Sequence, residues 1–162
     1  MTTSVTTTQA RQAVKARILA ATIVDSHSIA VPIRWQNEAQ DSLGSTELPD
    51  EPSPFIYCEF INESGKIAAF GGGRGANLYR NYAYVCAYVL VPKNEGLDEA
   101  ESIAEQVATL FRSYRDGTIT CFDATVYPGG DGAHMAPAGL SSPVGNYFYA
   151  TAEISLVFDL IG

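Results

Sequence analysis

Between Asn146 and Leu160, apolar side chains alternate with more polar ones at every second position. The apolar set is Phe148, Ala150, Ala152, Ile154, Leu156, Phe158 and Leu160. Successive side chains of a strand point to opposite faces of a sheet, so this pattern predicts one long strand with a core face and a wetter face. Helices elsewhere in the chain are the natural cover for such a core face.

Two segments have the apolar periodicity of helices. The first runs from about Thr8 to Val24, its apolar face is formed by Ala10, Val14, Ile18 and Ala21, and the threonines at 6–8 offer caps. The second covers residues 97–117, and its apolar face is formed by Leu97, Ala100, Ile103, Val107, Leu110 or Phe111, and Tyr114. Acidic residues occupy its first turns and Arg112 and Arg115 its last, and Gly117 is expected to end it.

Further segments rich in β-branched and aromatic residues are predicted to be strands: 29–35, 55–62, 66–70, 76–91 and 118–127. Pro32 favours an edge position for the first, and Trp35 is predicted to anchor the core or an edge. Ser64 and Gly65 indicate a turn after the second. From Tyr82 to Val91 both parities are apolar, which is typical of a central strand covered on both faces or of an exposed face used for assembly.

Two stretches without apolar periodicity, at about 36–54 and 128–145, are predicted to be long loops. A chain of 162 residues fits one domain. The predicted fold class is therefore α+β, with a mostly antiparallel β-sheet and two α-helices packed on one face in a single domain.

The net charge is −8, from 10 Lys and Arg against 18 Asp and Glu. Such a balance argues against a surface that binds phosphate backbones. No stretch approaches the roughly 18 uncharged apolar residues of a membrane span, and the N-terminus lacks the basic-then-apolar order of a signal peptide. We therefore expect a soluble protein that stays in the cytoplasm and binds neither membranes nor specific nucleic-acid sequences.

No residue pattern indicates catalysis. The GGGRG run at 71–75 lacks the Lys-Ser or Lys-Thr of a phosphate-binding loop, and it is predicted to be a turn between strands. His134 shares a loop with Asp131 and two serines, but no nucleophile elbow accompanies them. The three cysteines lie in apolar, strand-like segments and are predicted to be buried free thiols, so a zinc site is not expected. We expect a protein that is not an enzyme and needs no cofactor or metal.

Six features follow one another along the chain. They are an N-terminal helix, VPIRWQNE (31–38), PSPFIYCEFI (52–61), RNYAYVCAYVLVP (80–92), a helix ending in LF (110–111), and the closing strand YFYATAEISLVFDL (147–160). In this order the chain resembles the tail terminator family of long-tailed bacteriophages and gene transfer agents. The resemblance covers nearly the whole chain.

Members of that family form a six-subunit ring on the finished tail tube, which stops tube polymerisation and presents its other face to the head connector. The resemblance implies that residues 1–162 form one tail-terminator-like domain of a structural virion protein, assembled in the host cytoplasm and located at the head-proximal end of the tail. Its implied partners are further copies in a hexameric ring, the tail tube protein, and the connector or stopper protein. DNA would pass through an acidic lumen that repels it without specific binding.

Candidate contact residues follow from charge. Arg11, Lys15 and Arg17 form a cationic face on the first helix, which is either solvated or paired. We hypothesise that these cations face acids on an adjacent subunit, namely Asp41, Glu47, Asp50 and Glu51. The candidates for contact with the tube or the connector are Arg74, Asp131 and His134.

Two alternatives remain open. Another neck or tail component, such as a head–tail stopper or a tail-completion protein, shares the size, the acidity and the lack of chemistry. A small-ligand-binding or hydrolytic α+β domain, which would use the Tyr-rich strand and the DGAHM loop at 131–135, belongs to a different class.

Overall fold

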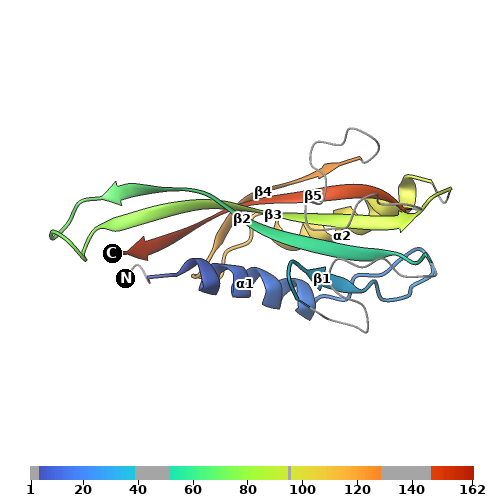
Figure 1. Ribbon diagram of the computed structural model, residues 1–162, viewed down its shortest axis with the longest axis horizontal. Helices are drawn as coiled ribbons and strands as arrows, with labels where there is room; N and C mark the ends of the chain where they lie inside the picture. The colour runs from blue at the N-terminus through green and yellow to red at the C-terminus, as the bar shows by residue number, and fades with distance from the viewer. Residues whose placement is uncertain (1–3, 39–51, 95, 129–146) are drawn as a thin grey trace.

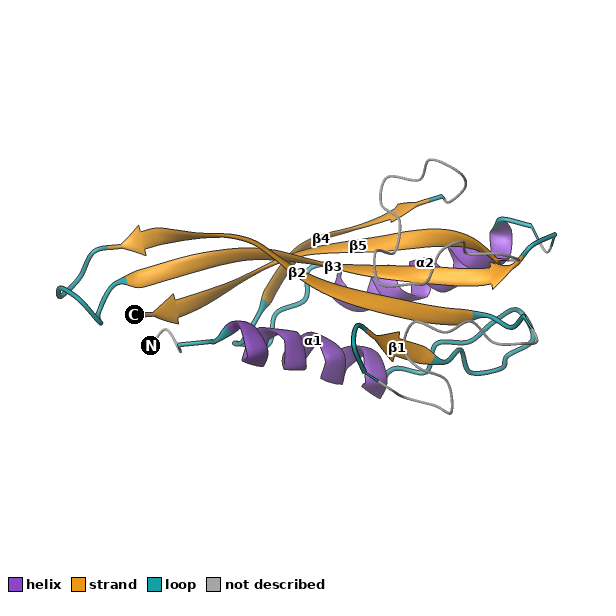
Figure 2. Cartoon of the chain, in the orientation of Figure 1, coloured by secondary structure: helices purple, strands orange, loops and turns teal. Residues whose placement is uncertain are grey.

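Five strands form one sheet in the order β1-β2-β3-β5-β4. The computed structural model describes residues 4–38, 52–94, 96–128 and 147–162. The elements are α1 (Thr7–Ala20), β1 (Ile33–Trp35), β2 (Phe55–Ala69), β3 (Leu78–Pro92), α2 (Asp98–Phe111), β4 (Thr120–Tyr127) and β5 (Tyr147–Ile161). Only the short β1–β2 pair is parallel, and the other three pairs are antiparallel. Both helices lie on one face of the sheet (Figures 1 and 2). The predicted fold class is confirmed.

The strand predicted at the chain's end is confirmed as β5, which lies between β3 and β4. Its core face runs through Ala150, Ala152 and Ile154, which are fully buried under the helices. The opposite face is more mixed than the alternation predicts, because Tyr147 and Thr151 are also buried.

Strand β3 occupies the centre of the sheet, which is the first of the two alternatives that its apolar sequence offered. Its odd-numbered residues from Ala83 to Val91 join the core that the helices cover. Its even-numbered residues from Cys86 to Leu90 join a second cluster on the other face, with Phe55, Tyr57 and Tyr147. This two-sided burial explains why both parities of the strand are apolar.

Helix α1 begins as predicted and ends earlier. Thr6 caps it, and its side-chain oxygen accepts a hydrogen bond from the Gln9 backbone N–H at 3.3 Å. Ala10, Val14 and Ile18 are fully buried, as the periodicity predicts. The helix ends at Ala20 and does not reach Val24, which instead forms a β-bridge with Ala30.

The edge position expected for the segment at Pro32 is confirmed in β1. This strand spans only Ile33–Trp35 and pairs with β2 alone. Trp35 is buried, so it anchors the core beside the sheet edge, as predicted.

The turn predicted at Ser64 and Gly65 is wrong, since β2 continues through both residues to Ala69. The register against β3 shifts between Asn62 and Ser64, so the chain accommodates the irregularity as a β-bulge. Glycine at position 65 fits the close packing of the partner strand, because a Cβ there would lie 2.6 Å from the Asn81 side-chain oxygen.

The end of α2 also differs from its prediction. The helix stops at Phe111, so Arg112 is its C-cap and Arg115 lies beyond it. Ser113 adopts a left-handed backbone with φ of 58° and turns the chain away, four residues before Gly117. Phe111, one of the two apolar positions left open at this end, is fully buried.

The two predicted long loops lie mostly outside the described residues. None of the helices in the described part of the chain is long and apolar enough to cross a membrane.

Candidate assembly surface

A projecting arm forms one end of the molecule. It consists of residues 62–82: the distal half of β2, the turn that contains GGGRG, and the start of β3. Figure 1 shows this hairpin extending past both helices, with the end of β5 beside it. No residue from 62 to 82 is buried, whereas β3 is almost wholly buried from Ala83 onward. The arm therefore has little hydrophobic core of its own in the single chain.

Large apolar side chains are exposed on and beside this arm. They are Ile67 (44%), Phe70 (83%), Tyr82 (40%) and, at the end of β5, Ile161 (42%). Single exposed apolar residues are ordinary, but several on a protruding ribbon are typical of a protein–protein contact. The sequence pattern offered an exposed assembly face from Tyr82 to Val91 as one alternative, but it did not indicate Ile67, Phe70 or Ile161, although Phe70 directly precedes the glycine-rich turn.

The base of the arm is fixed by charge. Arg80 on β3 donates two hydrogen bonds of 2.9 Å to the two carboxylate oxygens of Asp159 on β5. This bidentate pair lowers the pKa of the Asp159 carboxyl below its ordinary value of 3.8. The Lys66 ammonium lies 5.8 Å from the centre of the Tyr82 ring on the same ribbon.

We expect Asp159→Asn to lower the free energy of unfolding by less than about 1 kcal/mol, because the Arg80 side chain is 44% exposed and its ion pair is screened by water. The contribution is present above the ordinary carboxyl pKa and is lost as the pH falls through the lowered folded-state pKa. Urea unfolding at pH 7 and pH 3 should show the difference between variant and wild type shrinking at pH 3. Glu105→Gln, which breaks a more exposed pair with Arg112, is the matched control. A difference that grows at pH 3 would contradict the assignment.

The cations predicted on α1 have different surroundings. Lys15 forms an ion pair with Glu38 of the same chain. The Arg17 Nε donates to the Leu110 carbonyl oxygen at 2.7 Å, and its guanidinium stacks 3.5 Å from the centre of the Tyr114 ring. Arg11 is exposed. Within the chain, therefore, Lys15 and Arg17 already have partners that hold α1 against its neighbours.

The predicted acidic partners of these cations, Asp41, Glu47, Asp50 and Glu51, lie outside the described residues, as do Asp131 and His134. Pairing between subunits through these residues stays a prediction.

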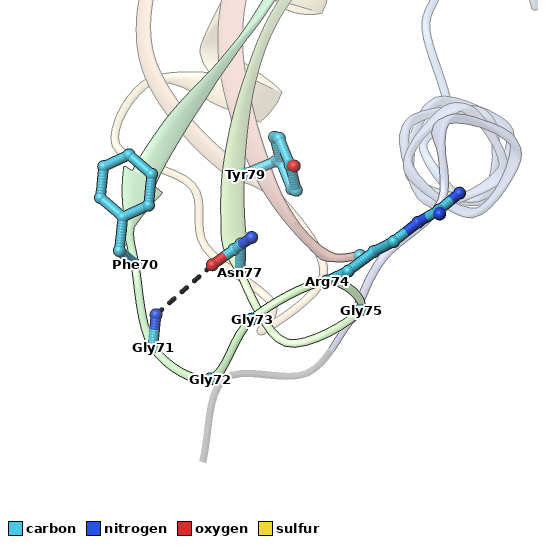
Figure 3. A pocket seen from close by; sticks show the side chains of 9 residues that line it. Phe70, Gly71, Gly72, Gly73, Arg74, Gly75, Asn77 and Tyr79 are labelled. Carbon is cyan, nitrogen blue, oxygen red and sulfur yellow. Dashed lines mark hydrogen bonds between the residues drawn. The ribbon is translucent and has the colours of Figure 1, made fainter.

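Arg74 lies at the tip of the arm, in the turn that the sequence predicted there. The turn borders an open hollow of about 660 Å³, lined by Phe70, Asn77, Tyr79, Gly162 and the residues 71–75 (Figure 3). The Gly71 N–H donates to the Asn77 side-chain oxygen at 3.4 Å, and Gly73 and Gly75 have positive φ values of 85° and 91°. Arg74 is exposed there, and its contact with the tube or the connector stays a prediction.

The three cysteines are buried free thiols, as predicted. Burial raises the pKa of Cys86 and of Cys121 to about 12, and it raises that of Cys58 as well. A nucleophilic cysteine needs the opposite shift, toward the thiolate. These thiols are therefore packing groups.

A buried polar cluster lies on the face of the sheet opposite the helices. Burial, together with the neighbouring Glu59 carboxylate, raises the pKa of Tyr57 to about 12. The Tyr57 ring stacks on that of Tyr88, with centroids 6.4 Å apart.

Within the described ranges, no group of three or more His, Cys, Asp or Glu side chains could hold a metal ion.

Fold and surface together define a small α+β protein with a five-stranded sheet, two helices on one face and a protruding apolar arm. No family model and no curated protein matches the sequence. Among the solved structures, one of a protein without a functional name is similar at a TM-score of 0.52 and 14% identity, over 94% of this chain and 95% of the other. At that identity the likeness extends to the fold alone.

Proposed function

We propose that this protein is a structural virion component that assembles into a ring, hexameric by the resemblance, on the head-proximal end of a phage tail or a related particle. There it ends polymerisation of the tail tube and forms the surface that joins the head connector. Its partners are further copies of itself, the tail tube protein and the connector or stopper protein.

The observation that carries the proposal is the arm. A ribbon that protrudes from the core and exposes Ile67, Phe70 and Tyr82 is suited to contact between subunits. The chain has a small α+β fold, and the resemblance to tail terminators implies a small α+β fold as well. The buried thiols with raised pKa values add support, because they leave no activated cysteine for catalysis.

The charge of the chain is compatible with a ring through which a genome passes. With a net charge of −8, a lumen lined by this protein would repel phosphates and would not retain DNA.

Electron microscopy of particles assembled without this protein tests the proposal. We expect tails that are overlong or ragged and that carry no filled heads, because nothing stops the tube or joins it. Adding the purified protein should restore both tail length and head joining. Normal tails that carry heads would contradict the proposal.

Binding experiments and the particles made without this protein distinguish a terminator from a head–tail stopper. A terminator caps purified tubes in the absence of heads, whereas a stopper binds the connector in the absence of tubes. Tails of normal length beside heads that leak DNA would indicate the stopper.

A further inference from the structure

The end of the molecule opposite the arm carries a small apolar hollow. It lies where β3 passes into α2, has a volume of about 300 Å³, and is lined by Lys93, Asn94, Gly96, Leu97 and Phe148. Leu97, the N-cap residue of α2, is 42% exposed there. The hollow therefore presents apolar surface that the single chain leaves accessible.

The exposed ring of Phe70 cannot reach this hollow within one chain. Phe70 lies just before β3, and the hollow lies just after it. The 15 residues of β3 separate the two sites by roughly 50 Å at the rise of an extended strand. Figure 1 shows the hairpin tip and the β3–α2 turn at opposite ends of the molecule.

The charges beside the two sites are complementary. Arg74 lies four residues from Phe70 and is exposed at the tip of the arm. Asp98 and Glu99 follow Leu97 directly and form the acidic first turn of α2. Lys93 is the one cation that lines the described part of the hollow, and an aromatic face accepts an ammonium. The tip of the arm is thus matched to the hollow in apolar character and in charge.

We propose that Phe70 of one copy inserts into this hollow of a second copy, with Arg74 facing Asp98 and Glu99. The contact joins different surfaces of identical chains, so it is heterologous, and its repetition makes the ring of the proposed function when the rotation between neighbours is one sixth of a turn. The inference rests on the proposed function in one respect, namely that copies of the chain assemble with each other, and it names the contact that joins them.

Charge placed at either site should break the contact. We expect Phe70→Glu and Leu97→Glu each to raise the concentration at which the protein assembles by about 30-fold, the effect of a hot-spot residue. Phe122→Glu is the matched control, because Phe122 is 60% exposed on β4, away from both sites, and it should assemble like wild type. Analytical ultracentrifugation measures the assembly, and circular dichroism verifies that each variant is folded. A folded Phe70→Glu variant that assembles like wild type would overturn the inference.

Mixing the two variants tests the direction of the contact. The Leu97→Glu chain keeps an intact arm, and the Phe70→Glu chain keeps an intact hollow. One contact can therefore form between the two variants, with the arm of the first in the hollow of the second. We expect the mixture to stop at a one-to-one dimer of the 17.4 kDa chain. Rings of either variant alone at the concentration where wild type assembles, or complete rings in the mixture at that concentration, would contradict a head-to-tail contact.

A cross-link gives an independent measurement. The three native cysteines are buried, so Phe70→Cys combined with Leu97→Cys provides the only exposed thiols. Mild oxidation should produce a ladder of covalent oligomers that ends at the size of the ring, whereas Phe70→Cys alone should produce no ladder. Absence of the ladder in the double variant would overturn the inference.

The outcomes separate this inference from the proposed function. Rings that form through Phe70 but leave tail length unchanged would support the contact and overturn the terminator role. Wild type that stays monomeric, with Phe70→Glu losing only its binding to tail tubes, would overturn the inference and identify the tube protein as the partner of the arm.

Discussion

Replacing Phe111 with alanine is expected to lower the free energy of unfolding by about 3–5 kcal/mol, the usual cost of removing a buried phenyl ring. Phe111 is fully buried at the end of α2 and belongs to the core between helices and sheet. Its ring also meets the Tyr114 ring edge-on, with centroids 6.2 Å apart. The loss therefore combines a cavity with a lost aromatic contact. Urea unfolding followed by circular dichroism measures it.

The same substitution at an exposed site is the control. Phe122→Ala on β4 should change stability by less than about 1 kcal/mol, because that ring is 60% exposed. Phe111→Leu keeps most of the buried volume and should lose less than Phe111→Ala. Equal losses for Phe111→Ala and Phe122→Ala would show that position 111 does not lie in the core.

Alkaline solution is expected to destabilise the protein progressively between pH 9 and pH 12. Burial raises the pKa of Cys86 and of Cys121 from 9.0 to about 12, so the folded chain keeps protons that the unfolded chain loses. The stability that these thiols contribute is fully present below pH 9 and is lost as the pH rises through the folded-state pKa. Urea unfolding at intervals across this range measures the slope.

Cys121→Ala removes one of these thiols and should make stability depend less steeply on pH above 9. It loses a sulfur from a packed site, so its stability at pH 7 is expected to be lower than that of wild type. A thiol reagent offers a second measurement, because the folded protein should react slowly at pH 8 and the unfolded protein quickly. Identical slopes for variant and wild type would contradict the shifted pKa of Cys121.

Helices and strands that repeat a pattern over many residues could be predicted from the sequence. The alternation that predicts β5 and the periodicity that predicts α1 each reflect burial along a whole element, as Ile154 and Val14 illustrate. Burial of β3 on both faces was one of the two alternatives that its sequence offered, and Val85 and Cys86, on opposite faces of the strand, are both fully buried. These predictions rest on the burial of many side chains along one element, so a single residue that breaks the pattern does not change them.

Local backbone events were not readable in the same way. Ser64 and Gly65 have turn composition, yet pairing with β3 absorbs them as a bulge, because the neighbouring strand satisfies the backbone groups that a turn would leave free. Gly117 is a good helix stop, but Ser113 turns the chain first so that residues beyond Phe111 can pair with β4. In both places a tertiary contact overrides local preference.

The candidate site was predicted only in part. Charge patterns drew attention to α1, where Lys15 and Arg17 have partners in their own chain. The projecting arm could not be predicted from the sequence. Phe70 and Ile67 are exposed because the hairpin extends beyond the helices, and no sequence periodicity indicates how far a hairpin extends. Arg74 at its tip is the predicted contact residue that the structure places on the arm.

The position of β5 in the sheet also governs the order of events during synthesis. Because β5 lies between β3 and β4, β4 has no neighbouring strand, and β3 has only β2, until the chain beyond Tyr147 has been synthesised. The hairpin of β2 and β3 forms between segments that are close in the sequence. Leu78 of β3 also pairs with Ile161 of β5, and that pair cannot form until residue 161 has been synthesised. Long-range pairing of this kind slows folding and exposes strand edges in the interval. Newly made chains therefore pass through a state in which one edge of β3 is unpaired and the sheet is open.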